Sequence, residues 1–138
     1  YIIRIFNKMK YFIHGHHACD LSDTYGDWTI NGEKYILHIK DIVPYLCAKN
    51  KKLIEFDEIS WKGKNIYHKV KLHESRYENC DIKYPCILTE GKNPHNCKYR
   101  MIDGKHRMTK MVKMGMSRSY FYVIDYDTFL KLLQPDDI

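Results

Sequence analysis

The sequence predicts one α+β domain, in which a small mixed β-sheet carries flanking helices. Three observations support this class. Residues 84–89 are almost all apolar, as in a strand that is buried on both faces at the centre of a sheet. Residues 99–125 follow a strand–turn–helix–turn–strand pattern, and Asn31-Gly32 joins two β-rich runs as in a hairpin. A chain of 138 residues can close a single core without disulfides, so we expect one domain over residues 1–138.

Two short strands are expected first, at residues 2–6 and 11–13. A loop at 21–27 and a β-hairpin at 28–37 are expected after them. The hairpin has the clearest local pattern. Asn31 and Gly32 are residue types that tolerate the positive φ needed at both central positions of a type I′ turn. We expect Trp28, which lies just before the turn, to pack in the core rather than to stack on a ligand.

Short elements and links are expected to alternate in the middle of the chain. Residues 39–48 carry apolar side chains at helical spacing and predict a short amphipathic helix, which Pro44 either delays to about Val43 or kinks. A loop of basic residues is then expected at 49–52, followed by a strand at 53–56 and a turn-rich link at 57–64. A second strand is expected at 66–72 and one helical turn at 75–79. The strand at 66–72 is predicted from its alternation of apolar and polar residues.

The pattern after the central strand is the strongest in the chain. Residues 90–98 are expected to connect it, as a hairpin loop, to a strand at 99–102. The helix that follows has an apolar face at i, i+3, i+4 spacing, made by Met108, Met111 and Val112. Gly115 stands where a glycine ends a helix, and a β-rich run at 120–124 predicts the last strand.

A closing helix is expected at residues 126–133. Asp125 or Asp127 would cap its first turn, because a carboxylate there accepts hydrogen bonds from free backbone N–H groups. The apolar side chains expected to face inward are Phe129, Leu130 and Leu133.

The candidate binding residues lie at the junction of the 99–102 strand and its helix. Gly104 allows a sharp turn, and Lys105, His106 and Arg107 occupy the first helical turn. Cations there oppose the helix dipole, whose N-terminal end is already positive. The same arrangement of free N–H groups and cationic side chains is well suited to holding a phosphate. The alternative interpretation is a solvated helix start that happens to be basic.

Two carboxylates are candidates for chemistry beside such a phosphate. Asp103 precedes the turn and could act as a general base or bind a phosphate-linked Mg²⁺. Glu74, which we expect just after the 66–72 strand, is the second candidate. The alternatives are that Asp103 only forms the turn before Gly104, and that Glu74 is a surface group paired with Arg76 or a lysine.

Residues 102–107 (IDGKHR), the helix after them and residues 81–89 (DIKYPCILT) resemble the ParB/sulfiredoxin superfamily. Members carry a Gly-x-His-Arg or Gly-Glu-Arg-Arg element between a strand and a helix and bind nucleotide phosphates with it. The resemblance extends over about residues 72–126. It implies a ParB/sulfiredoxin-like fold with a recognisable core at about 66–126, preceded by an extension over 1–65 that contains the hairpin and the short helix.

Within that superfamily the residues are most similar to the branch of ADP-dependent free-serine kinases. The matching residues are His73-Glu74, the Asp-Gly-Lys-His-Arg run at 103–107 and the Val-Ile-Asp-Tyr run at 123–126. The resemblance implies that Asp103 and Glu74 are catalytic and that the phosphate ligands are Gly104, His106 and Arg107. Lys105, where the branch usually has a histidine, and His73 are further candidate phosphate ligands. Lys105 replaces the reactive cysteine of sulfiredoxin, so sulfinic-acid reduction is not expected. The chain also lacks the helix-turn-helix of partition proteins.

Two functions from different classes remain. The first is a nucleotide-dependent phosphotransferase or nucleotide hydrolase that uses ATP, ADP or CTP, with Mg²⁺ as a further option and a hydroxyl-bearing acceptor in the transfer case. The second is a non-catalytic nucleotide switch or DNA-associated module with the same binding residues. A ParB-like nuclease is a weaker third option. The sequence carries no indication of the oligomeric state.

The positive charge is weak evidence for DNA binding. The formal net charge is +6 and the pI about 9.0, but lysines outnumber arginines 18 to 5 and no run of five like charges occurs. A dedicated nucleic-acid arm is therefore not evident. The abundance of Lys, Ile, Tyr and Asn is also typical of translation from an AT-rich genome, viral or cellular, which raises the lysine content without a functional cause.

The five cysteines form no CxxC pair, which favours reduced thiols and an intracellular, cytoplasmic location. No apolar run approaches the ~20 residues that span a bilayer, so we expect no membrane partner. His14, His16, His17 and Cys19 are residue types that bind zinc, but their spacing fits no closed zinc site and favours a polar loop. We expect the native start to be Met9, or the sequence to be a fragment.

Overall fold

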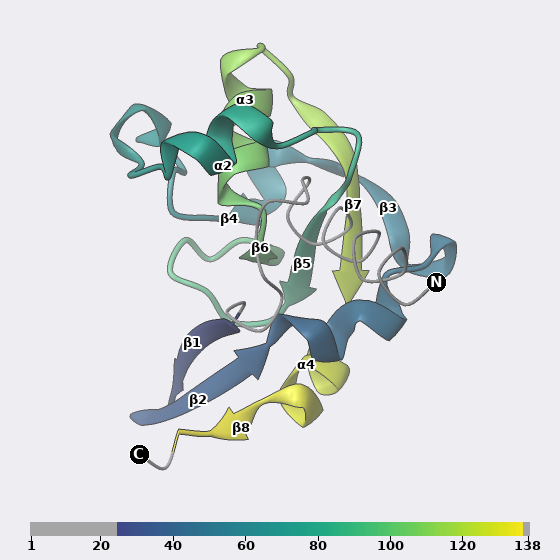
Figure 1. Cartoon of the computed structure of the whole chain (residues 1–138). Coiled ribbons are helices and arrows are strands. Elements are labelled where there is room, and N and C mark those ends of the chain that lie inside the picture. The colour runs from purple at the N-terminus through teal and green to yellow at the C-terminus, as the bar shows by residue number, and fades with distance from the viewer. Residues whose placement is uncertain (1–24, 137–138) are drawn as a thin grey trace.

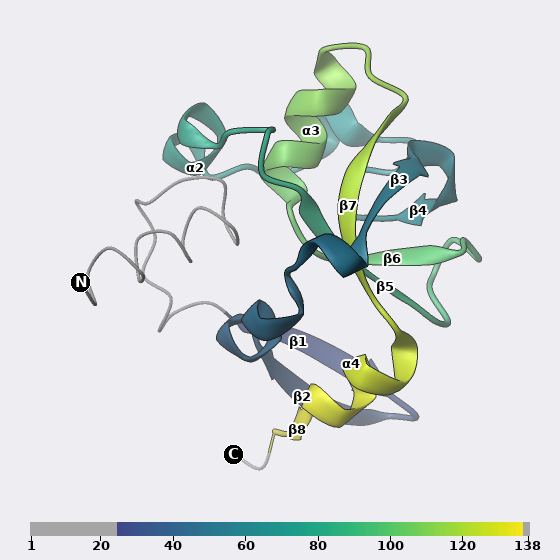
Figure 2. The same cartoon turned by 90° about the vertical axis from the view of Figure 1, so that its right-hand side faces the viewer.

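The computed structural model describes residues 25–136. The strands expected at 2–6 and 11–13, and the His14–Cys19 cluster, lie outside these residues. Eight described strands form two sheets, which lie at opposite ends of the molecule with the larger one next to α2 and α3 (Figures 1 and 2). The strands are β1 Tyr25–Ile30, β2 Glu33–His38, β3 Lys51–Glu55, β4 Ile59–Ser60, β5 Cys86–Glu90, β6 Tyr99–Asp103, β7 Arg118–Ile124 and β8 Gln134–Pro135.

The described helices are short, and four of them are 3₁₀ helices. The α-helices are α2 Glu74–Asn79, α3 Lys105–Lys113 and α4 Tyr126–Leu132. The 3₁₀ helices are η2 Ile39–Tyr45, η3 Ala48–Asn50, η4 Phe56–Glu58 and η5 Tyr67–Lys69. With two sheets and these helices the α+β class is confirmed.

The larger sheet is mixed, with strand order β3-β7-β5-β6-β4. The pairs β5–β7 and β4–β6 are parallel, whereas β3–β7 and β5–β6 are antiparallel. The expectation of a buried central strand at 84–89 is confirmed in kind, because β5 is the middle strand and residues 86–89 are all buried, but the strand begins at Cys86 rather than Tyr84. Residues 90–98 connect β5 to β6 as expected. The smaller sheet has the order β1-β2-β8.

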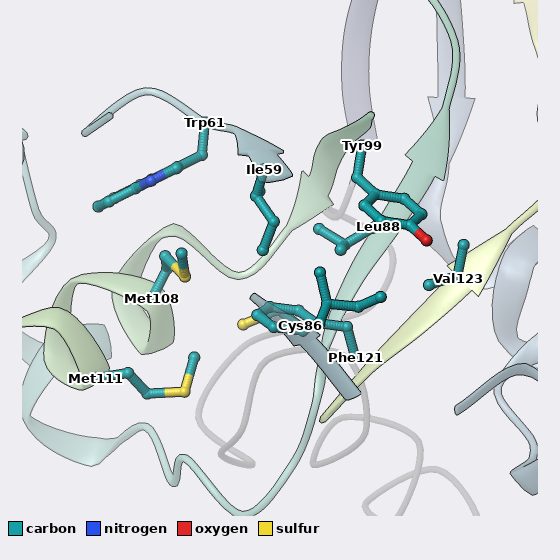
Figure 3. Close-up of a cluster of buried hydrophobic side chains, with 10 residues drawn as sticks. Ile59, Trp61, Cys86, Leu88, Tyr99, Met108, Met111, Phe121 and Val123 are labelled. Carbon is teal, nitrogen blue, oxygen red and sulfur yellow. The ribbon is translucent and has the colours of Figure 1, made fainter. Parts of the chain in front are cut away.

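The larger sheet separates two apolar cores. Side chains that alternate along β5 and β7 point to opposite faces, since a strand has a period of two. Cys86, Leu88, Phe121 and Val123 join a core with Met108 and Met111 of α3 (Figure 3). Ile87 and Ile124 join the second core, together with Trp28, Leu37, Ile42 and Phe129 from the hairpin, η2 and α4. Each side chain of this kind that leaves water contributes about 1.5–3 kcal/mol.

The hairpin prediction is confirmed. Asn31 and Gly32 have φ of 53° and 81°, and the strands on either side pair antiparallel from Tyr25–His38 to Ile30–Glu33. The expected loop at 21–27 is wrong at its end, because β1 already begins at Tyr25. Trp28 lies in the second core and is 8% exposed, as expected.

The helix expected at 39–48 is a 3₁₀ helix, η2, that carries Pro44 inside it. Proline has no N–H to donate, so the segment does not build the i→i−4 ladder of an α-helix. The last turn closes with a short-range bond from the Leu46 N–H to the Val43 carbonyl, at 3.0 Å. Ile42, in the same segment, is fully buried.

Three expectations between residues 49 and 72 are wrong. The loop expected at 49–52 ends in the first residues of β3, where Lys51 and Lys52 pair with β7. The link at 57–64 contains β4, which pairs with β6. Residues 66–72 form η5 and irregular chain instead of a strand. In the first two cases, pairing with a distant strand creates a strand that the local pattern does not show. In the third case, residues 66–72 have an alternating pattern but pair with none of the described strands.

In the C-terminal third, the predicted helix ends are confirmed. Gly115 has φ of 81°, its N–H donates to the Val112 carbonyl, and the Met116 N–H donates to the Met111 carbonyl, which together make a Schellman ending of α3. Asp125 caps α4 by accepting from the Thr128 N–H at 2.8 Å. Phe129 is buried as expected, but Leu130 is 38% exposed, so its inward position was predicted wrongly.

Candidate functional site

A cavity of about 320 Å³ lies where β6 ends and α3 begins. We call it the junction cavity. Its lining residues are Trp61, Lys62, Arg76, Met101, Ile102, Asp103, Gly104, Lys105, His106 and Arg107. Five of the residues chosen from the sequence, Asp103 to Arg107, therefore lie at one cavity. His73 and Glu74 are not among the lining residues, and both are exposed.

Gly104 makes the turn from β6 into α3, and two constraints act on it. Its φ of 127° lies in the left-handed region, which side chains disfavour. A Cβ atom at this position would also collide with the Sγ and Cβ atoms of Cys86 in β5. The backbone of the turn consequently lies directly on the central strand, with the Cys86 thiol 3.5 Å from the Gly104 carbonyl.

The Cys86 thiol is fully buried, so it is not accessible to solvent. Its burial raises the thiol pKa to about 11; the charge of Arg107 opposes this rise, and the charge of Asp103 adds to it. The thiol therefore stays protonated at neutral pH, and a protonated thiol is a poor nucleophile. Cys86 is a packing residue under the turn.

Arg107 ties the first turn of α3 to the entry of β5. The residue is 1% exposed, and its Nη1 donates to the carbonyls of Tyr84 and Pro85 at 3.1 and 2.9 Å. Its Nη2 donates to the Asp103 carboxylate at 3.2 Å. A buried guanidinium with such partners holds the wall of the cavity, in addition to any part it takes in binding.

Asp103 is the carboxylate that lines the junction cavity. Its side chain is 27% exposed, and the Arg107 guanidinium holds one of its oxygens. An i, i+4 ion pair between the strand end and the helix fixes the orientation of this carboxylate. Glu74, in the first turn of α2, lies outside the lining, so the structure does not bring the two candidate carboxylates together at this cavity.

His106 connects α3 to α2. Its Nε2 accepts a hydrogen bond from the His73 N–H at 3.0 Å, and the His73 ring in turn accepts from the Arg76 N–H at 3.4 Å. At the other end of α2, Lys110 of α3 donates to the carbonyl of Cys80 at 3.0 Å. Held at both ends in this way, α2 carries Arg76 to the cavity.

Besides Arg107, which is paired with Asp103, three cations from three different segments line the junction cavity: Lys62 after β4, Arg76 in α2 and Lys105 in α3. None of them forms an ion pair with another residue in the described range 25–136. The pKa of Lys105 is lowered, chiefly by burial and then by the charges of Lys62 and Arg76. The smaller part of this shift, from Lys62 and Arg76, reflects the positive potential that these charges place at the cavity and that an anion would neutralise.

The sequence missed Lys62 and Arg76 as binding residues. Lys62 follows β4, which reaches the cavity only because β4 pairs with β6. From the sequence, Arg76 is expected only as a partner for Glu74. No local pattern marks either residue, because both depend on contacts between distant segments. Trp61 and Met101 add apolar lining that was likewise not predicted.

The chain matches no known protein family, no curated protein and no solved structure. Within residues 25–136, no group of three His, Cys, Asp or Glu residues could hold a metal ion. No described helix is long and apolar enough to cross a membrane. The geometry of the junction cavity is therefore the basis for the functional argument.

Proposed function

We propose that the chain binds a nucleotide by its phosphates in the junction cavity and promotes phosphoryl transfer or nucleotide hydrolysis there. The observation that carries this proposal is the group of three cations, Lys62, Arg76 and Lys105, around one cavity without ion-pair partners in the described chain. Placing like charges together costs free energy, and an anion of two or more charges recovers it.

Two further features support a nucleotide rather than a small inorganic anion. The volume of about 320 Å³ falls in the range of small-molecule sites, about 300–1,000 Å³. The lining also combines the cations with Trp61, Met101 and Ile102, which offer apolar and aromatic surface to a base or ribose. The backbone N–H groups at the start of α3 provide uncharged donors beside the cations.

We also propose that the chain belongs to the ParB/sulfiredoxin-like superfamily, on the basis of residues 103–107. The run at 103–107 lies between a strand and a helix, as the resemblance implies. This position supports the assignment because the backbone turn at Gly104 and the cation at Lys105 both reach the cavity.

Asp103 is the proposed general base. It would accept the proton of a water or acceptor hydroxyl, whose oxygen then bonds to the terminal phosphorus while the bond to the bridging oxygen breaks. The nucleotide leaves with one phosphate fewer, and the three cations stabilise the charge on the leaving group. A single carboxylate beside phosphates also suits a nucleotide-bound Mg²⁺, to which Asp103 would supply one oxygen.

The first experiment is calorimetric titration of the chain with ATP, ADP and CTP, with and without Mg²⁺. We expect micromolar binding of at least one nucleotide, weakened about tenfold or more by Arg76→Gln or Lys105→Gln, since each removes a charge-assisted contact. Lys34→Gln, an exposed lysine on β2, is the matched control and should change nothing. Absence of binding by the unaltered chain would refute the proposal.

A non-catalytic nucleotide switch is the alternative, and Asp103→Asn separates it from an enzyme. An enzyme should lose turnover of the bound nucleotide while it keeps affinity, because the amide still accepts from Arg107 but cannot take a proton. Phosphate release and affinity are measured on the same samples. A chain that binds nucleotide but shows no turnover before the substitution is a switch.

A further inference from the structure

The loop between β4 and α2 has an unusual charge. Residues 62–71, which we call the basic loop, contain four lysines and one histidine and no acidic residue. The lysines are Lys62, Lys64, Lys69 and Lys71. The basic loop projects from the body of the molecule at the upper left of Figure 1. Lys62 also lines the junction cavity, but neither the fold nor the proposed function accounts for the other three lysines.

The basic loop has a defined conformation. Successive tight turns shape it, with hydrogen bonds from Lys64 to Trp61, Ile66 to Gly63 and Lys69 to Ile66 along the backbone. Gly63 is buried so closely between Trp61 and Val70 that a Cβ atom there would collide with both side chains. These contacts anchor the two ends of the loop on the core. The surface between them is consequently preformed, which lowers the entropic cost of binding.

Two apolar residues are held outward among the lysines. Ile66 is 47% exposed and Tyr67 is 38% exposed. The Tyr67 ring meets the His68 ring edge to face, with 6.0 Å between centroids. An anchored loop that exposes an aromatic ring among cations offers a flat stacking surface next to positive charge.

The basic loop is continuous with the junction cavity. Lys62 belongs to both, and it lies at the cavity with Lys105 and Arg76. Positive charge therefore runs from the cavity along the loop. A ligand that follows this path must carry repeated negative charges, and one that uses Tyr67 must also carry a flat ring.

We propose that the basic loop binds single-stranded nucleic acid. A single strand supplies both features at every nucleotide, a phosphate for a lysine and an unpaired base for Tyr67. A duplex hides its bases from such a ring, and an acidic peptide has the charge without the flat surface. The proposal does not rest on nucleotide binding in the cavity, because Tyr67, Lys69 and Lys71 are not among the lining residues.

The test is the fluorescence anisotropy of a labelled twelve-nucleotide oligothymidylate titrated with the full chain at several salt concentrations. The variant Lys69→Gln/Lys71→Gln removes two exposed charges of the basic loop, and Lys34→Gln/Lys49→Gln removes two exposed charges elsewhere. Loss of two phosphate contacts should lower the slope of log affinity against log salt by about 1.4. The control pair should keep the slope of the unaltered chain.

Substitution of the ring provides an independent readout. Tyr67→Ala should weaken oligonucleotide binding about tenfold, because stacking on one base is lost. Tyr67→Phe keeps the ring and should bind like the unaltered chain. Neither substitution should alter the affinity for a mononucleotide, so failure of this proposal is distinguishable from failure of the proposed function.

Four results would overturn the inference. They are absence of oligonucleotide binding, equal weakening by the two lysine pairs, equal affinity for a duplex of the same length, and equal affinity for a polyglutamate peptide. Oligonucleotide binding that depends on Tyr67 and on the lysine pair would establish the basic loop as the binding surface, even for a chain that binds no free nucleotide.

Discussion

Gly104 is the residue on which the geometry of the junction cavity depends most directly. It has a left-handed φ and lies against Cys86, whereas Gly32 has a left-handed φ and no atom within 4 Å of a Cβ position. Gly104→Ala should therefore cost about 2–6 kcal/mol, from backbone strain of about 1–3 and overpacking of about 1–3. Gly32→Ala carries the strain alone and should cost about 1–3 kcal/mol.

Urea unfolding of both glycine variants measures this difference. Equal destabilisation by the two substitutions would mean that Cys86 yields easily to the added methyl group, and that the close contact does not restrict the turn.

Cys86 should make the free energy of unfolding depend on pH. The raised pKa means that the unfolded chain loses the thiol proton at lower pH than the folded chain does. The contribution to stability is therefore full below the ordinary thiol range and decreases as pH rises toward about 11. Cys86→Ala removes this titration, so its free energy of unfolding should fall less steeply between pH 8 and pH 10.5. Parallel profiles for the two proteins would contradict the assignment.

At the scale of elements, α2 is held in place by its neighbours rather than by its own packing. It has six residues and no buried side chain, too few for a stable isolated helix. Its two ends are fixed by His106 and Lys110, and the Lys110 ammonium also lies 5.2 Å from the centre of the Tyr77 ring. The location of Arg76 is therefore set indirectly by α3.

Lys110→Met should loosen α2 without touching the cavity lining. We expect amide exchange in α2 to accelerate about tenfold, while exchange in α3 stays unchanged, because a lost charged hydrogen bond is worth about 1.5–3 kcal/mol. Hydrogen-exchange mass spectrometry measures both helices in one sample. Lys131→Met on α4 is the control, and an equal effect from it would show that α2 is not held by Lys110.

Element prediction succeeded where the determining contacts are local. Asn31-Gly32 fixes the hairpin, and Gly115 and Asp125 fix helix ends, through hydrogen bonds and φ values within a few residues. β4 has two residues and exists only because β6 lies beside it, so no local pattern could reveal it. The same reason explains the site. Residues 103–107 were found from one contiguous run, whereas Lys62 depends on the β4–β6 pairing.

At the scale of the whole molecule, the larger sheet separates the core that supports the helix of the site from a second core on its other face. The core on one face contains Met108 and Met111 of α3, the helix whose first turn lines the junction cavity. The core on the other face joins side chains of the sheet to the hairpin, η2 and α4, and the half-buried Ile102 alone of its described members lines the cavity. Damage to the two cores should therefore have different consequences for ligand binding.

Phe129→Ala and Met111→Ala compare the two cores at similar cost. Phe129 is 3% exposed and packs edge to face on Trp28 at 5.1 Å, and Met111 is 2% exposed. The losses in free energy of unfolding should be about 3–5 and 2–5 kcal/mol, as for large-to-small core substitutions. Met111→Ala should also weaken nucleotide binding, since α3 loses its support, whereas Phe129→Ala should not. Urea unfolding and calorimetric titration of both variants measure this, and equal loss of affinity would mean that the sheet couples the two cores rather than separating them.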